Sequence, residues 1–312
     1  MRIEYHRVLI ADRVRNAAFT EALRRVIVKG QTRVADIGAG TGLLGFLAAR
    51  LGAKRVVLYE SAEVAGVAAR LAGQNRIRNC TIVAARSTEV EAPEKADVVV
   101  SETLGNYVFE EHLIETVNDA RRRILAPGGE LIPRRIRQFV CPVVNDRFHR
   151  ELCAWDEIGH GLEFTPAKVM SLNNIYVRWF DPADLMDGAS AAQLCDEADL
   201  QKPCKSTRSG EADWRFGEAQ EISGFALWWA AELVDGLWLA TGPLDPRTHW
   251  EQLYLPTLKK IRVKAGETLA FRFRSITSQE GGTDIAWSAA HLDAGGRAIQ
   301  RQSLALEKGF LP

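Results

Sequence analysis

The chain has 312 residues, and its 40 lysine and arginine residues are matched by 40 aspartate and glutamate residues, so its formal net charge is zero. This length is enough for one large domain or two modest ones with a sizeable buried core. The neutral charge argues against a nucleic-acid partner, and the lack of any apolar run of about eighteen residues argues against a membrane partner.

The N-terminal residues 1–6 are charged and contain no apolar segment of the kind that a signal peptide carries. The five cysteines are an odd number without a C-x-x-C pair, which indicates reduced thiols rather than a disulfide framework or a zinc site. No cluster of histidines suggests a metal site either. We therefore expect a cytoplasmic protein without a bound metal.

A strand predicted at Arg33–Ile37 runs into a glycine-rich turn that contains Gly38, Gly40 and Gly42. Glycines there let the backbone approach a ligand closely, because no Cβ atom stands in the way. Glu60 ends the next predicted strand, where an acidic side chain can accept both ribose hydroxyls of a nucleoside. These features predict a nucleoside-binding site.

The spacing of these glycines distinguishes two kinds of nucleotide site. In a dinucleotide-binding G-x-G-x-x-G turn the third glycine would fall at position 43, which is Leu43. The turn instead reads G-x-G-x-G, with Asp36 two residues before it, and so resembles motif I of the class I S-adenosylmethionine-dependent methyltransferases. Their ligand has no pyrophosphate to place over the helix N-terminus. The resemblance implies S-adenosylmethionine as cofactor and S-adenosylhomocysteine as product.

Two glutamates, Glu102 and Glu111, frame an acidic loop (residues 102–111) that follows a strand predicted at residues 96–100. In an open α/β sheet, ligands bind in the crevice beyond the carboxyl ends of the strands. Two carboxylates there would form a clamp for a planar cation such as guanidinium, whose donors match carboxylate oxygens pairwise. The alternative is that both glutamates are solvated loop charges.

The pattern of the chain changes at about Pro133. Before it, apolar runs alternate with helical periods, which predicts a Rossmann-like, doubly wound parallel sheet in an α/β domain over residues 1–133. After it, shorter alternating segments rich in aromatic residues predict an antiparallel β-barrel or sandwich over residues 134–312. The polar stretch at residues 187–219 is expected to be a long loop.

Together, these segments resemble the protein arginine methyltransferases over nearly the whole chain. The likeness rests on the motif I turn, on Glu60, on the acidic loop and on Thr248-His249-Trp250 in the second domain. It implies an arginine N-methyltransferase that transfers a methyl group from S-adenosylmethionine to a guanidinium nitrogen. The arginine would belong to a protein or peptide, or would be free L-arginine. The number of methyl groups transferred and their symmetry stay open.

The resemblance also implies roles for individual residues. Glu102 and Glu111 would hold the guanidinium, and Asp12 would pair with His249 across the domain boundary. The cofactor would be bound by His6, Arg15, Asp36, Gly38, Gly40, Gly42, Glu60, Ser87 and Thr88. Arg15 would bind the methionine carboxylate, which its forked guanidinium suits. The released proton would pass to one of the two glutamates or to His249, and the sequence does not rank these acceptors.

Each of these residues also has a structural interpretation. Asp12 and Arg15 could form an i, i+3 ion pair on a solvated helix face. His249 could be a buried histidine bonded to a backbone carbonyl. For the whole chain, a non-catalytic binding protein of methyltransferase fold and a methyltransferase of another small-molecule amine stay open.

The sequence departs from the family pattern in three places. Family members usually have an aromatic helix before the histidine, aspartate and arginine segment, and we expect this chain to lack it, so that the cofactor cover is either thin or supplied by another element. Thr103 stands where many members have tryptophan, and Leu9 where several have methionine. Both changes leave substrate choice open.

Members of the family commonly dimerise through an arm that projects from the β domain. The resemblance therefore implies a homodimer, with the arm near residues 155–181. The apolar residues of that segment could equally pack inside the barrel.

Overall fold

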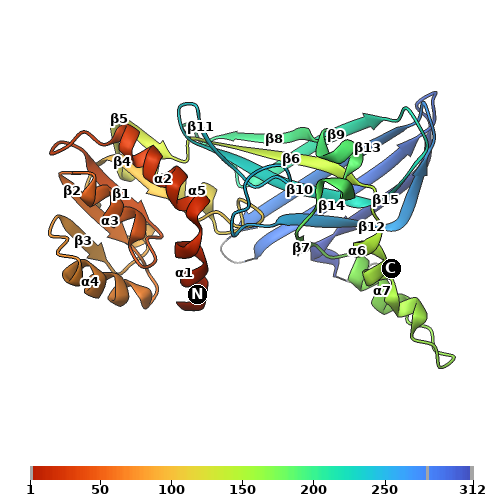
Figure 1. Ribbon diagram of the computed structural model, residues 1–312, viewed down its shortest axis with the longest axis horizontal. Coiled ribbons are helices and arrows are strands. Elements are labelled where there is room, and N and C mark those ends of the chain that lie inside the picture. The colour runs from red at the N-terminus through yellow and green to blue at the C-terminus, as the bar shows by residue number, and fades with distance from the viewer. Residues whose placement is uncertain (1–2, 279–280, 310–312) are drawn as a thin grey trace.

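The computed structural model describes residues 3–278 and 281–309, and Figure 1 shows a parallel sheet with its helices at one end and antiparallel sheets at the other. The parallel sheet has the order β3-β2-β1-β4-β5. Its strands are β1 (Arg33–Ile37), β2 (Arg55–Tyr59), β3 (Cys80–Val83), β4 (Ala96–Ser101) and β5 (Leu125–Ile132). This order confirms the predicted Rossmann-like, doubly wound sheet.

Helices pack against this sheet and bury its central strands. They are α2 (Arg13–Val26), α3 (Leu43–Arg50), α4 (Val64–Gln74) and α5 (Leu113–Arg123), with a short 3-10 helix η1 (Ser87–Glu89). The first helix, α1 (Ile3–Ala11), is mostly exposed, and His6 is its buried residue. Val34 and Ala35 of β1 and Val98 to Val100 of β4 are buried, as expected for a parallel sheet covered on both faces. The direction of winding reverses between β1 and β4, and ligand crevices form at such a reversal.

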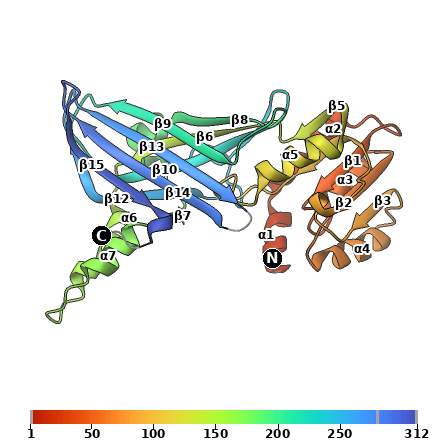
Figure 2. The same ribbon diagram turned by 180° about the vertical axis from the view of Figure 1, so that it is seen from behind.

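Two antiparallel sheets face each other in the second part of the chain (Figure 2). The first has the order β7-β12-β10-β6-β8, with β11 paired to β10, and is made of β6 (Arg135–Val143), β7 (Tyr176–Arg178), β8 (Gln193–Asp199), β10 (Gln220–Val234), β11 (Leu237–Ala240) and β12 (Gln252–Val263). The second has the order β15-β14-β13-β9 and is made of β9 (Thr207–Arg215), β13 (Thr268–Ser278), β14 (Gly282–Leu292) and β15 (Ala298–Ala305).

Aromatic side chains fill the space between the two antiparallel sheets. The rings of Phe225 on β10 and Phe271 on β13 have centroids 4.6 Å apart, and the ring of Trp214 on β9 stacks on Phe225. Along β13, buried residues alternate with partly or fully exposed ones, so one face of the strand points into this core. The predicted antiparallel barrel or sandwich is thus confirmed.

The prediction of a long loop at residues 187–219 is wrong, because this stretch contains all of β8 and all of β9. On β9 the inward residues Gly210, Ala212 and Trp214 are buried, and they alternate with charged outward residues such as Glu211 and Asp213. The high charge of the outward face made the segment look polar, although every second residue faces the core.

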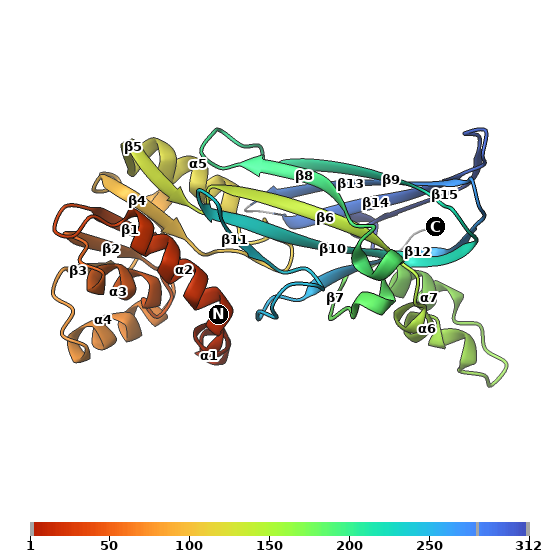
Figure 3. The same ribbon diagram turned by 45° about the horizontal axis from the view of Figure 1, so that its top comes forward.

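A helical hairpin projects from the barrel (Figure 3). It contains α6 (Arg147–Leu152), the 3-10 helix η2 (Ala154–Glu157) and α7 (Thr165–Leu172). Leu172 is buried at its base, whereas Leu162 and Met170 are exposed. Three further 3-10 helices are η3 (Pro182–Asp184), η4 (Met186–Ala189) and η5 (Leu306–Lys308).

Two further observations concern membrane-spanning helices and the state of the cysteines. Within the described residues, no helix combines the length and the apolar character needed to cross a membrane. The five cysteines are all free thiols.

Candidate active site

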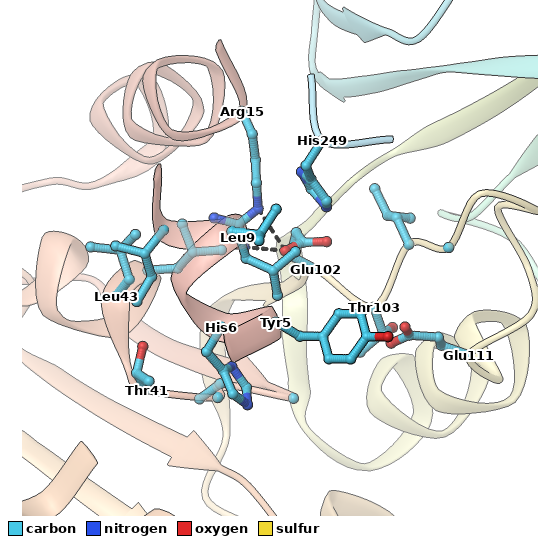
Figure 4. Close-up of a pocket in the computed structure, with 18 of the residues that line it drawn as sticks. Tyr5, His6, Leu9, Arg15, Thr41, Leu43, Glu102, Thr103, Glu111 and His249 are labelled. Carbon is cyan, nitrogen blue, oxygen red and sulfur yellow. Dashed lines mark hydrogen bonds and ion pairs between the residues drawn. The ribbon is translucent and has the colours of Figure 1, made fainter. Parts of the chain in front are cut away.

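A cavity of about 730 Å³ lies where the carboxyl ends of β1, β2 and β4 approach the barrel (Figure 4). Its wall comes from α1, the glycine-rich turn, the acidic loop and the segment before β12. The volume is within the range of about 300 to 1,000 Å³ that is typical of small-molecule sites. The polar and charged residues of its wall include His6, Arg15, Asp36, Glu60, Glu102, Glu111 and His249.

In the glycine-rich turn, backbone atoms without side chains form part of the cavity wall. Gly38 and Gly40 line the cavity and have positive φ values of 71° and 56°. A Cβ atom at Gly38 would lie 2.6 Å from the side chain of Thr103, and one at Gly40 would lie 3.1 Å from the ring of His6. Gly42 has a φ of 90° and caps α3 behind the wall. The turn therefore requires glycine for both conformation and space.

Asp36 and Glu60, the two acidic residues predicted to lie at the cofactor site, both accept hydrogen bonds from backbone N–H groups. Asp36 accepts a hydrogen bond from the backbone N–H of Gly45, 2.8 Å away, in the first turn of α3. Burial raises the pKa of Asp36 to about 7. Glu60 accepts from the N–H groups of Gly40 and Ala62, at 2.8 and 2.7 Å. Each carboxylate oxygen of Glu60 retains capacity for a further donor.

Helix α1 covers one side of the cavity. Tyr5, His6 and Leu9 line it, and Figure 4 shows Tyr5 extending toward Thr103 and Glu111. His6 is buried, and its Nε2 atom finds no hydrogen-bond partner in the described part of the chain. Burial lowers the pKa of His6, so the ring is neutral near pH 7. A buried nitrogen without a partner is a costly arrangement that a ligand would relieve.

Arg15 on α2 and Glu102 in the acidic loop form a buried ion pair. Nε of Arg15 lies 2.7 Å from Oε2 of Glu102, and a second guanidinium nitrogen contacts the same oxygen. Only 7% and 6% of their side-chain surfaces are exposed. Burial raises the pKa of Glu102 to about 7, against the opposing effect of the Arg15 guanidinium. The interpretation of Glu102 as a solvated loop charge is therefore wrong.

Glu111 occupies a different environment from Glu102. It lines the same cavity, but its side chain is exposed, and Figure 4 shows it on the far side of Thr103 from Arg15. Leu9 and Thr103, the two positions at which the sequence departs from the family pattern, line the cavity as well. The two glutamates thus share one cavity with unequal burial.

Asp12 joins the two parts of the molecule through His249. One carboxylate oxygen of Asp12 lies 2.7 Å from the backbone N of His249 and 2.8 Å from its Nδ1, and the other caps α2 through the N–H of Arg15. Burial opposes ionisation of Asp12, but the hydrogen bonds from Arg15 and His249 outweigh it and lower the pKa of Asp12. The pairing that the resemblance implied is present.

His249 is neutral in this arrangement. Burial lowers the pKa of His249, and the Asp12 carboxylate opposes this effect only in part. Because ionised Asp12 can only accept hydrogen bonds, Nδ1 carries the ring proton and Nε2 has a free lone pair. The alternative of a histidine satisfied by a backbone carbonyl is wrong, since its ring contacts a carboxylate.

Three of the predicted cofactor residues, Gly42, Ser87 and Thr88, do not line the cavity. Ser87 and Thr88 lie in η1, where Ser87 is buried and its carbonyl accepts a hydrogen bond from Arg123, 2.6 Å away. Thr88 is exposed. All the other predicted site residues line the cavity except Asp12, which caps α2 behind the wall as Gly42 caps α3.

The sequence did not identify Tyr5 as part of the wall, and it indicated Trp250 only as part of the Thr-His-Trp segment. The indole N–H of Trp250 donates to the carbonyl of Leu104 in the acidic loop, 2.6 Å away. The Thr-His-Trp segment was the one sequence signal for this contact. Among the described residues, no group of three His, Cys, Asp or Glu side chains is placed to hold a metal ion.

Comparison with known proteins shows which proteins this chain resembles. Residues 19–136 match the family model for the ribosomal protein L11 methyltransferase (PrmA), and residues 136–286 match that for the arginine methyltransferase oligomerization subdomain. The probable histone-arginine methyltransferase 1.4 of Arabidopsis thaliana is 29% identical over 293 residues, which are 86% of this chain and 53% of that protein. The chain is thus similar to the protein arginine methyltransferases over most of its length.

A second relative shows the same extent of similarity. The probable histone-arginine methyltransferase CARM1 of Oryza sativa subsp. indica is 28% identical over 285 residues, covering 86% of this chain and 53% of that protein. The chain thus spans about half the length of the curated relatives it matches.

Solved structures of arginine methyltransferases share the fold of this chain. A chain of the Trypanosoma brucei PRMT1 enzyme-prozyme heterotetrameric complex with AdoHcy superposes with a TM-score of 0.87 at 22% identity, covering 97% of this chain and 98% of that one. Protein arginine methyltransferase 10 of Arabidopsis thaliana gives a TM-score of 0.82 at 21% identity, covering 98% of both chains. At these identities the likeness is one of fold.

Proposed function

We propose that this protein is an S-adenosylmethionine-dependent arginine N-methyltransferase. The observation that carries the proposal is the presence of a nucleoside-type turn and a buried carboxylate in one cavity. Gly38, Gly40 and Glu60 form one side of that cavity, and Glu102 with Arg15 forms another. The match of residues 136–286 to the arginine methyltransferase oligomerization subdomain and the names of the curated relatives, which are histone-arginine methyltransferases, support the same reaction.

The cavity fits the cofactor that this reaction needs. The bare backbone of Gly38 and Gly40 leaves room for a ligand, and the partnerless Nε2 of His6 offers it a hydrogen-bonding group. The carboxylate of Glu60 suits ribose hydroxyls, and the guanidinium of Arg15 suits a carboxylate. When bound, S-adenosylmethionine supplies a methyl group on a positively charged sulfur and becomes S-adenosylhomocysteine.

Glu102 and Glu111 would hold the guanidinium of the substrate. A guanidinium has a pKa above about 12 and stays charged near pH 7, so the protein must position it rather than deprotonate it beforehand. Both contacts from Arg15 reach Oε2 of Glu102, which leaves Oε1 outside the ion pair. Alignment of this kind can lower a barrier by up to about 7 to 11 kcal/mol. The two carboxylates also offset repulsion between positive charges in a cavity of low dielectric.

The proton that leaves the reacting nitrogen has two kinds of acceptor in this cavity. His249 is neutral and holds a free Nε2 lone pair, with its ring oriented by Asp12. Glu102 has a pKa raised to about 7 by burial and is therefore a stronger base than an exposed carboxylate. Both remain candidates for the proton acceptor.

The substrate that we propose is an arginine in a protein or peptide, because the curated relatives are named for histone arginines. The test is mass spectrometry of the purified protein after incubation with S-adenosylmethionine and either an arginine-rich peptide or free L-arginine. Methylated peptide supports the proposal, and methylated free arginine alone would move the substrate to a small molecule. Intact cofactor binding with no product from either substrate would overturn the enzyme assignment in favour of a binding protein.

We also infer a homodimer that forms through the projecting hairpin of α6, η2 and α7. Support comes from the match of residues 136–286 to an oligomerization subdomain and from the exposed apolar residues of the hairpin, Ile158, Leu162 and Met170. Sedimentation velocity of the wild type and of Leu162→Asp tests it, because the variant should shift toward the monomer.

We also propose a cytoplasmic location, which the five free cysteines support and which can be tested by fractionation.

A further inference from the structure

Trp229 on β10 belongs to the barrel, yet its indole reaches the acidic loop. The side chain is buried, and its Nε1–H donates to the backbone carbonyl of Gly105, 3.0 Å away. The neighbouring carbonyl, that of Leu104, accepts from the indole of Trp250. The two indole rings pack edge to face with centroids 4.9 Å apart. Two consecutive carbonyls between Glu102 and Glu111 are therefore held by one pair of barrel tryptophans.

The acidic loop has little structure of its own. It contains neither helix nor strand between β4 and α5. At Gly105 a Cβ atom would lie 1.9 Å from the carboxylate of Glu110, so a larger residue there would require that flexible side chain to move. Contacts from outside the loop therefore help to hold its conformation.

The barrel provides that support at several points. The backbone N–H of Glu251 donates to the side-chain oxygen of Asn106, 2.9 Å away, and the hydroxyl of Tyr107 contacts that of Ser275 on β13. Trp229 differs from these contacts because it holds the main chain itself. Its rigid ring can donate only one hydrogen bond, so it fixes one carbonyl direction.

We propose that Trp229 is a positioning residue for the methyl transfer, which acts through the Gly105 carbonyl to keep the carboxylate of Glu102 in the plane of the bound guanidinium. The inference rests on the proposed function, since it concerns the same site. In this proposal a residue of barrel strand β10 orients Glu102, which follows β4 of the parallel sheet. The distance in sequence between Trp229 and Gly105 is 124 residues.

The variant Trp229→Phe tests this role, because it keeps an aromatic ring and removes the N–H. A matched control is Trp287→Phe on β14. Trp287 is also buried, and its Nε1–H also donates to a backbone carbonyl, that of Pro256, 2.8 Å away. Both variants delete one buried indole hydrogen bond from the barrel, but only the first touches the acidic loop.

The activity readout separates positioning from packing. For Trp229→Phe we expect kcat with an arginine-rich peptide to fall about tenfold or more, with the Kd for S-adenosylmethionine within about twofold of wild type. The control should keep the wild-type kcat while losing a similar amount of stability. Equal kcat values in the two variants, or parallel losses of kcat and cofactor affinity in Trp229→Phe, would overturn the proposal.

A second readout needs no turnover, and it separates failure of this inference from failure of the proposed function. Amide hydrogen exchange of residues 102–111 should be faster in Trp229→Phe than in wild type and unchanged in the control. Equal exchange in both variants would reject the role of Trp229 even if the wild type makes no product. If Trp229→Phe does not fold, replacement of Trp229 by benzothienylalanine removes the N–H within the same ring shape and decides between the same outcomes.

Discussion

Arg15 on α2 and Glu102 in the acidic loop are joined by a buried ion pair, with Nε of Arg15 2.7 Å from Oε2 of Glu102. One partner is proposed to bind the cofactor and the other to bind the substrate. The pair therefore connects the two halves of the reaction inside one cavity. A ligand that attracts either side chain will alter the charge environment of the other.

We expect Arg15→Lys to weaken cofactor binding. The lysine ammonium keeps the charge but loses the planar fork that makes two parallel contacts. The Kd for S-adenosylmethionine should rise about tenfold, equivalent to about 1.4 kcal/mol, which is near the value of one charge-assisted hydrogen bond. Isothermal titration calorimetry measures this change. Arg24→Lys, at an exposed position on the same helix, is the control and should bind as wild type does.

We expect Glu102→Gln to abolish most turnover. The amide keeps the shape of the side chain but cannot balance the charge of a guanidinium or accept a proton. Turnover of an arginine-rich peptide should fall by about a hundredfold or more, while cofactor binding stays largely intact. Glu91→Gln, at an exposed loop position, should be fully active. Normal turnover in Glu102→Gln would disprove the carboxylate clamp.

The pH dependence of kcat/KM should report the ionisation of Glu102. Burial raises the pKa of Glu102 to about 7, and the clamp requires the carboxylate form. Below that value most of the free enzyme is protonated at Glu102, so kcat/KM should rise with pH and level off above it. His249, whose pKa is lowered, adds a second inflection at lower pH. A kcat/KM that decreases between about pH 6 and about pH 8 is incompatible with this assignment.

Asp12→Asn should separate the capping role of Asp12 from its charge. Asparagine is also a good N-cap, so the hydrogen bond to the N–H of Arg15 should persist. The pKa of His249 should fall further, because the carboxylate that raises it is gone. We expect the free energy of unfolding to fall by about 1 to 2 kcal/mol, measured by chemical denaturation, with the histidine followed by NMR titration. Asp12→Ala should lose about 1 kcal/mol more, since the cap is removed too.

Asp36→Asn should change how stability depends on pH. Burial raises the pKa of Asp36 to about 7 in the folded protein, well above its value in the unfolded chain. Between these two values the folded state binds a proton that the unfolded state does not, so stability falls as pH rises. The variant lacks this effect. Its free energy of unfolding relative to wild type should increase by about 2 kcal/mol from about pH 5.5 to about pH 8. A relative stability that stays constant with pH would mean that Asp36 is ionised throughout.

The sequence by itself determined the features that depend on local backbone geometry and periodicity. The turn at Gly38 and Gly40 needs positive φ values and bare backbone, and only glycine meets both needs, so its pattern is visible in the sequence. The apolar runs of β1 and β4 likewise reflect burial on both faces of a parallel sheet. The position of Glu102 directly after β4 placed it at the ligand-binding edge.

Only the tertiary structure decided which side chains meet. Asp12 and His249 are 237 residues apart, and Arg15 and Glu102 are 87 residues apart, so their contacts depend on how the barrel packs against the parallel sheet. Burial of Glu102 but not Glu111 follows from the same packing. The contact of Trp229 with Gly105 had no sequence signal, because a tryptophan in a barrel strand has the same local pattern whether its N–H meets a core carbonyl or a catalytic loop.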